Sequence, residues 1–193
     1  MSKIKKEKIS TVSIEGINTG IEQDVLGEMK KQTKSPTEPK LETKIIMGHV
    51  GTGKYAYLQH FLHKYSKECK FLLVDGDKLH FPFYRSASFL LHPIVEYDWD
   101  KFSRVLRWIS QEIDNRKEEN KKEPKIALLV GQYAASMRLH KDLTEKIFIK
   151  IAKEGKDLGI YLIATTSRGE SKEVVTDKMR KYILIENFDK YKK

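Results

Sequence analysis

Short apolar runs alternate with longer amphipathic segments over most of the chain, from Thr43 onward. The candidate strands are the apolar runs at 44–48, 70–75, 126–131, 159–165 and 181–186. Segments with helical spacing of apolar residues lie at 53–65, 99–115 and 137–154. Runs that are continuously apolar are typical of strands covered on both faces. A repeated strand–helix–strand order therefore predicts an α/β fold with a mainly parallel central sheet, right-handed crossovers and flanking helices.

Residues 1–42 follow a different pattern. Four lysines lie within residues 3–8, residues 9–14 alternate as a strand would, and residues 34–40 read KSPTEPK, which is rich in turn formers. We interpret this stretch as a basic tip, a small strand-bearing segment and a linker, followed by one domain over 43–193. Plain disorder of residues 1–42 is the alternative.

Composition adds a charge and a setting. The 193 residues carry 37 Lys plus Arg against 27 Asp plus Glu, a net charge of +10, which favours an acidic partner without identifying it. Lys outnumbers Arg and no compact Arg-rich stretch is visible, which disfavours specific contacts to DNA bases. DNA is therefore the alternative to a protein partner rather than the first choice. The single cysteine, Cys69, cannot form an internal disulfide, which favours a reducing, cytoplasmic setting. No apolar run approaches the about 20 residues that a membrane-spanning helix needs, so none is expected.

A phosphate-binding pattern, G-x-x-x-x-G-K, follows the first predicted strand directly and precedes a predicted helix. It consists of Gly48, His49, Val50, Gly51, Thr52, Gly53, Lys54 and Tyr55. Glycines let backbone N–H groups turn toward an anion, the helix adds its positive N-terminus, and Lys54 can reach the terminal phosphates. A glycine-rich turn that binds nothing is the alternative.

Three positions depart from what hydrolysis needs. Tyr55 stands where a Ser or Thr hydroxyl binds Mg²⁺, and a phenol on a ring cannot take that place in a tight octahedron. At the end of the strand 126–131, Gly131 and Gln132 stand where a Mg²⁺-binding acid and a catalytic carboxylate are required. We expect no catalytic residue, no metal site, and at most ATP binding without Mg²⁺.

Four segments in order resemble the FtsK/SpoIIIE family of translocation ATPases. They are IIMGHVGTGKYAYL, FLLVDGDKLHFPFY, PKIALLVGQYAASM and IFIKIAKEGKDLGIYLIATT. Within the fourth segment, Thr166 stands where the family's sensor strand ends in Gln. The resemblance spans roughly 43–180. It implies a RecA-like P-loop NTPase fold, with the nucleotide site at 48–55 and Gly131, Gln132 and Thr166 as its altered remainder.

Within that family the chain looks most like the degenerate C-terminal ATPase-like module of EssC-type coupling proteins in type VII secretion. This resemblance implies a non-hydrolysing interaction or regulatory domain, cytosolic and belonging to a membrane-anchored protein. Its partner would be a secretion substrate or a neighbouring ATPase module. The alternative is a DNA-translocation domain of the FtsK or conjugation type, which binds ATP and needs a partner module for turnover.

The remaining predictions concern packing. Trp108 lies among apolar positions of its helix and is expected in the core, and so are most aromatic residues between 81 and 99. If that aromatic stretch is exposed instead, it is the first candidate for a partner surface. Residues 116–125, RKEENKKEPK, are expected to form a solvated helix end and loop. His60 and His63 lack a further ligand at suitable spacing, so a helix surface is expected there rather than a metal site.

Overall fold

The computed structural model describes residues 37–76, 81, 84–96, 98–167 and 173–191. The basic tip and the strand-like alternation at 9–14 lie outside these residues. So do residues 34–36 of the linker, and the proposed division of the chain near residue 42 stays a prediction.

The core is a six-stranded sheet in which every strand pair is parallel. The strands are β1 (Lys44–Gly48), β2 (Cys69–Asp75), β3 (Val95–Glu96), β4 (Lys125–Gly131), β5 (Ile160–Ser167) and β6 (Leu184–Asn187). Their order is β3-β2-β4-β5-β1-β6. The predicted α/β class with a parallel central sheet is confirmed.

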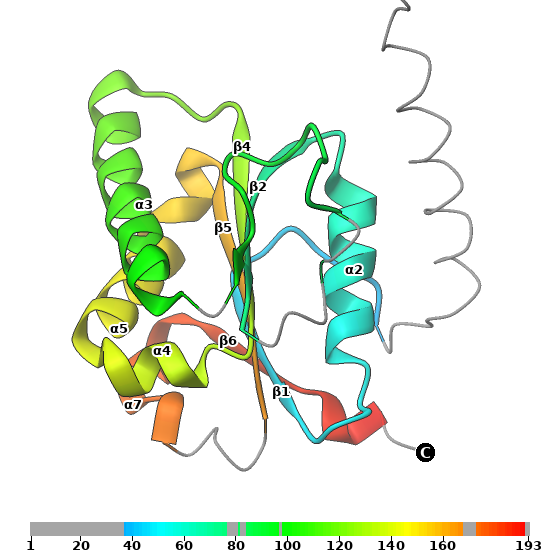
Figure 1. The fold of residues 1–193 in the computed structure, drawn as a ribbon. Coiled ribbons are helices and arrows are strands. Elements are labelled where there is room, and N and C mark those ends of the chain that lie inside the picture. Colours follow the sequence, from blue (N-terminus) through cyan, green and yellow to red (C-terminus); the bar gives the residue numbers. More distant parts are fainter. Residues whose placement is uncertain (1–36, 77–80, 82–83, 97, 168–172, 192–193) are drawn as a thin grey trace, which may run out of the picture. The chain divides into compact units, whose positions relative to one another are not determined.

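Helices cover both faces of the sheet (Figure 1). One face carries α2 (Lys54–Tyr65), and the other carries α3 (Trp99–Glu119), α4 (Ala134–Leu139), α5 (Lys141–Lys150) and α7 (Asp177–Tyr182). A π-helical turn, η3 (Ile151–Gly155), and a 3-10 turn, η4 (Lys156–Leu158), follow α5, and the 3-10 turn η5 (Phe188–Tyr191) follows β6. Each apolar strand is therefore buried on both sides, which explains its continuous rather than alternating pattern.

Helix α3 buries the stripe that its spacing predicted. Asp98 caps its N-terminus by accepting from the backbone N–H of Lys101 at 2.8 Å. The apolar positions of the stripe are all buried against the sheet and α5, namely Phe102, Val105, Leu106, Ile109 and Ile113.

Two predicted elements differ most from the observed ones. The helix predicted at 137–154 is broken at His140, whose backbone is not helical (φ −136°, ψ 46°), so α4 ends and α5 begins there. No Gly or Pro marks this break. The strand predicted at 181–186 begins only at Leu184, because residues 181 and 182 complete the last turn of α7.

The prediction of a solvated stretch at 116–125 is wrong for Arg116, which is 1% exposed. Its guanidinium donates to Glu112 Oε1 at 2.7 Å and to the backbone oxygens of Lys122 (3.1 Å), Pro124 (2.8 Å) and Leu158 (2.8 Å). Arg116 therefore joins the end of α3 to the loop before β4 and the turn before β5.

The prediction of a buried Trp108 is also wrong, since this side chain is 43% exposed. The aromatic stretch between 81 and 99 is largely internal, as predicted: Phe81 and Tyr84 are buried, and Phe89 and Trp99 are half-buried. Phe83 and Tyr97 lie outside the described residues.

Candidate functional site

The phosphate-type loop connects β1 to α2 at the carboxyl edge of the sheet. Gly48 pairs with Ser167 at the end of β5, and Gly131 ends β4 on the far side of β5. Open parallel sheets bind ligands at this edge. The sheet thus gathers the predicted loop, the altered acid positions and Thr166 at the ends of three adjacent strands.

The glycines of the loop are required by its backbone. Gly51 and Gly53 have φ of 82° and 84°, a left-handed conformation that favours glycine. At Gly48 a Cβ would lie 2.6 Å from Thr52 Oγ1, which donates to the backbone oxygen of His49 at 2.9 Å. The loop is therefore a tightly closed turn between β1 and α2.

Lys54 is folded onto this loop. The side chain is 4% exposed, and its Nζ donates to the backbone oxygens of Gly48 at 2.7 Å and His49 at 2.8 Å. Burial lowers the pKa of Lys54, and the negative charge of Asp189 opposes that shift. Two of the three ammonium donors are thus engaged, which leaves one for an anion. Val50, at the tip of the loop, is 87% exposed, so solvent reaches the turn.

Asp189 supports the loop by direct contact, although it lies outside the sequence motif. It lies in η5, and its Oδ1 accepts from the backbone N–H of His49 and contacts His49 Nδ1, both at 2.8 Å. The turn is held by Asn187 Oδ1, which accepts from the backbone N–H of Asp189 at 2.9 Å. Because 140 residues separate Asp189 from His49, no local pattern could have indicated this contact.

Tyr55, which the family resemblance aligns with a Mg²⁺-binding hydroxyl, lies in the first turn of α2, where its side chain is half-buried. At the end of β4, Gly131 is buried and its backbone oxygen accepts from the N–H of Gly76 at 3.3 Å. The neighbouring carboxylate, Asp75, is 1% exposed and accepts from the backbone N–H of Phe81 at 3.1 Å. Asp75 is thus engaged in holding the connection after β2.

Gln132 and Thr166 complete the set of residues that the family resemblance assigns to the nucleotide site. Gln132 takes a left-handed backbone conformation (φ 55°), and its N–H donates to Thr165 Oγ1 at 3.1 Å. Gln132 Oε1 and Thr166 Oγ1 are both buried, and neither has a hydrogen-bond partner among the described residues. Buried oxygens without partners are unusual in folded proteins, and here both belong to the positions that the sequence marked as altered.

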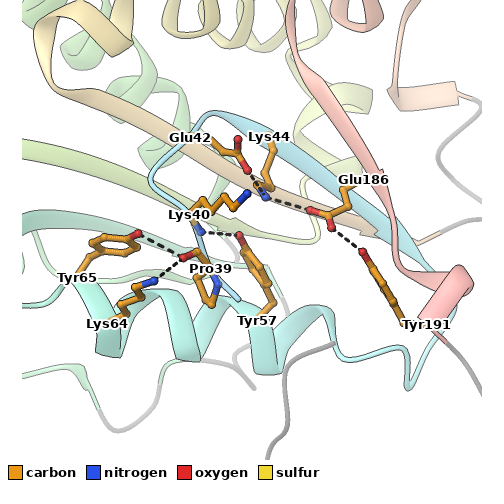
Figure 2. A network of polar contacts seen from close by, with 9 residues as sticks. All are labelled: Pro39, Lys40, Glu42, Lys44, Tyr57, Lys64, Tyr65, Glu186 and Tyr191. Atoms are coloured by element: carbon orange, nitrogen blue, oxygen red, sulfur yellow. Dashed lines mark hydrogen bonds and ion pairs between the residues drawn. The ribbon is translucent and has the colours of Figure 1, made fainter. Parts of the chain in front are cut away.

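A polar network braces the other end of β1 (Figure 2). Lys44, 3% exposed, has its Nζ 2.7 Å from Glu42 Oε1 and 3.0 Å from Glu186 Oε2 in β6. Tyr191 in η5 donates its hydroxyl to Glu186 Oε1 at 3.2 Å. On α2, Tyr57 accepts from the backbone N–H of Lys40 at 3.4 Å. The network joins the segment before β1 to α2, β6 and the turn that carries Asp189.

The described residues contain no group of three or more His, Cys, Asp and Glu side chains placed to hold a metal ion. In the same residues, no helix is both long and apolar enough to span a membrane.

No family model matches the chain, and no curated protein sequence matches it. Solved structures do. EssC (ATPases 2 and 3) from Geobacillus thermodenitrificans is similar at a TM-score of 0.60 and 16% identity, over 77% of this chain and 32% of that one. The pCW3 conjugation coupling protein TcpA, in a monomer form with ATPgS, gives 0.60 and 17%, over 75% of this chain and 47% of that one.

A third structure is EccC (ATPases 2 and 3) from Thermomonospora curvata, in complex with a signal sequence peptide. It gives a TM-score of 0.57 and 12% identity, over 73% of this chain and 28% of that one. The chain thus spans 28% to 47% of the length of these three structures. At these identities the likeness establishes the fold. The chain has the P-loop ATPase fold of the EssC, EccC and TcpA domains, as its resemblance to the FtsK/SpoIIIE family predicted.

Proposed function

We propose that this chain is a catalytically degenerate FtsK/SpoIIIE-like ATPase module of a type VII secretion coupling protein, which binds a protein partner and does not hydrolyse nucleotide. One observation carries this proposal. Tyr55, Gly131 and Gln132 occupy the positions where a working ATPase of this family has a Mg²⁺-binding hydroxyl, a Mg²⁺-binding acid and a catalytic carboxylate. Phosphoryl transfer depends on those groups, because they position the metal and the attacking water.

The loop itself keeps its binding features. Its glycines take the required conformations and Lys54 retains one donor. The module would therefore bind ATP or another polyphosphate without Mg²⁺. The bound nucleotide would act as a regulatory ligand and would not be hydrolysed. Its partner would be a secretion substrate or a neighbouring ATPase module, and the module would be the cytosolic part of a membrane-anchored protein. The peptide complex of EccC and the EssC likeness support this choice.

A calorimetric titration with ATP, with and without Mg²⁺, tests the metal-free site. We expect affinities that agree within about twofold in the two conditions, because the described residues hold no group of carboxylates placed for a Mg²⁺ ion. Absence of heat in both conditions would leave a module that acts through its partner alone. Binding that tightens about tenfold when Mg²⁺ is added, about 1.4 kcal/mol, would contradict the proposal.

Asp189 should weaken anion binding at the loop. Asp189→Asn retains an oxygen that accepts from the His49 N–H but removes the negative charge that acts on Lys54. We expect tripolyphosphate to bind roughly three- to tenfold more tightly to this variant, a Coulomb effect of about 1 kcal/mol near a protein surface. Calorimetry or a competition assay would measure it.

Asp142→Asn is the matched control for that variant. It removes the same charge from an exposed position in the first turn of α5. If both variants change the affinity equally, the effect reflects net charge alone and Asp189 has no special influence on the loop.

The alternative function is a DNA-translocation ATPase-like domain that binds ATP and turns over only with a partner module. The likeness to TcpA, as high as that to EssC, and the net charge of +10 favour it. Its distinguishing result would be ATP turnover that appears on mixing with a separate motor module, together with duplex DNA binding that weakens steeply with salt.

A further inference from the structure

A pocket of about 410 Å³ lies between α3 and the connection from β2 to β3. Its lining includes Leu72, Leu91, Lys101, Arg104, Val105 and Trp108, and His92 adds a further side chain at the rim. The phosphate-type loop follows β1, and β4 and β5 separate β1 from β2 in the sheet. The pocket is therefore a different site from the one that the sequence motif marks.

Helix α3 supplies one wall of the pocket. Lys101, Arg104, Val105 and Trp108 follow the spacing i, i+3, i+4, i+7, so they form a single stripe along the helix. The stripe lies next to the buried stripe of the same helix, which is packed on the sheet. Because α3 is a capped helix of 21 residues, this wall is preformed rather than assembled by a partner.

The floor of the pocket is apolar and closed, whereas its upper walls are open. Leu72 and Val105 are 4% and 8% exposed, but Trp108 and Leu91 are 43% and 41% exposed. An exposed aromatic side chain next to an apolar floor leaves apolar surface in contact with water, which is unfavourable. Such a place accommodates one bulky apolar side chain.

The two ionised side chains in the described lining, Lys101 and Arg104, are both cationic, and the carboxylate of Asp98 lies beside them. Arg104 makes no hydrogen bond among the described residues. Lys101 has its Nζ 3.2 Å from Asp98 Oδ2, but both side chains are more than a third exposed, so this pair contributes little. An exposed guanidinium offers a planar pair of donors that matches a carboxylate.

We propose that this pocket docks an acidic segment of a protein partner. The segment inserts a bulky apolar side chain beside Trp108 and sets its carboxylates against Arg104 and Lys101. A nucleic acid suits the pocket less well, because its phosphates gain nothing from contact with the apolar floor. In addition, two cationic groups can neutralise only a few phosphates of a backbone. The proposal rests on the partner-binding role proposed above and gives that role a surface and a chemistry.

A fluorescence-anisotropy titration tests it with a capped, fluorescein-labelled 12-residue peptide of alternating Glu and Leu. We expect saturable binding to the full chain. The expected losses are about tenfold or more for Trp108→Ala and for Arg104→Glu, the size typical of central anchors in an interface. Trp108 and Arg104 are exposed, so both variants should keep the far-ultraviolet circular dichroism of the parent.

Two variants serve as controls and should change the affinity less than twofold. Leu139→Ala removes an exposed apolar side chain of α4, and Lys146→Glu reverses an exposed charge of α5. Two further peptides separate the contributions of charge and apolar surface. A Lys/Leu peptide and a Glu/Ser peptide of the same length should each bind at least tenfold more weakly than the Glu/Leu peptide.

Three results would overturn the proposal: equal binding of the Glu/Leu peptide to all variants, equal binding of all three peptides, or tighter binding of a single-stranded oligonucleotide that Arg104→Glu abolishes. The last result would assign the pocket to nucleic acid. None of these three results bears on the proposal that the module does not hydrolyse nucleotide. Conversely, Mg²⁺-dependent ATP turnover would contradict the proposed function but would not change the peptide-binding result. The two proposals therefore fail separately.

Discussion

Replacing Arg116 with alanine is expected to lower the free energy of unfolding by about 3–5 kcal/mol. The guanidinium is buried and donates to one carboxylate and three backbone oxygens, so its loss leaves these acceptors without a donor. A buried acceptor without a partner keeps its full desolvation cost. Urea denaturation followed by circular dichroism would measure the change.

Lys117→Ala is the control for that experiment, because it removes the neighbouring charge of the same helix. Lys117 pairs with Glu154 at 2.7 Å, but its side chain is half exposed, and such pairs contribute about 0–1 kcal/mol. Arg116→Lys should lie near the alanine variant, since an ammonium cannot reproduce the planar fork. A loss below 1 kcal/mol in Arg116→Ala would show that solvent reaches these acceptors.

Replacing Lys44 with methionine is expected to cost about 2–4 kcal/mol of stability. The change leaves Glu186, whose side chain is 14% exposed, without its cationic partner and loosens β6 and η5 from β1 (Figure 2). The same chain segment carries Asp189, so the variant should also weaken the bracing of the phosphate-type loop. Lys70→Met, which removes a half-buried lysine of β2 bound to one backbone oxygen, is the matched control and should cost less than about 1 kcal/mol.

The contribution of Lys44 should depend on pH in one direction. Burial disfavours the ammonium, but hydrogen bonds with Glu42, Tyr57 and Glu186 outweigh it and raise the pKa of Lys44 above 10.5. A raised pKa means a contribution that is complete below the unfolded value of about 10.4 and is lost as the pH rises through the folded value. The difference in stability between the parent and Lys44→Met should thus be constant from pH 6 to 9 and shrink above that. A difference that grows with rising pH would contradict this assignment.

Local patterns were sufficient for the loop and for five of the six strands, whereas the two-residue strand β3 was not predicted. The apolar runs of β1, β2, β4 and β5 are continuous because helices cover both faces of the sheet. The loop follows β1 directly, so its pattern can also be recognised from neighbouring residues in the sequence. The bracing of the loop had no such signal. Asp189 meets His49 across 140 residues and Glu186 meets Lys44 across 142, and the parallel pairing of β6 with β1 creates both contacts.

The errors have a common physical origin. Spacing along a helix indicates which side an apolar residue faces but not whether another element covers it, and over Trp108 none of the described residues completes the cover. Arg116 was expected in solvent because its neighbours are charged. It is buried because the turn of η4 and the loop before β4 close over it with backbone oxygens. A long cationic side chain becomes internal when the backbone supplies acceptors, and composition does not record this.

Phosphate release from ATP in the presence of Mg²⁺ would show whether this P-loop fold hydrolyses nucleotide. We expect the chain and its Lys54→Ala variant to be indistinguishable from a reaction without protein. Turnover by the parent chain that disappears in Lys54→Ala, yet persists in Lys156→Ala at an exposed position, would contradict this expectation.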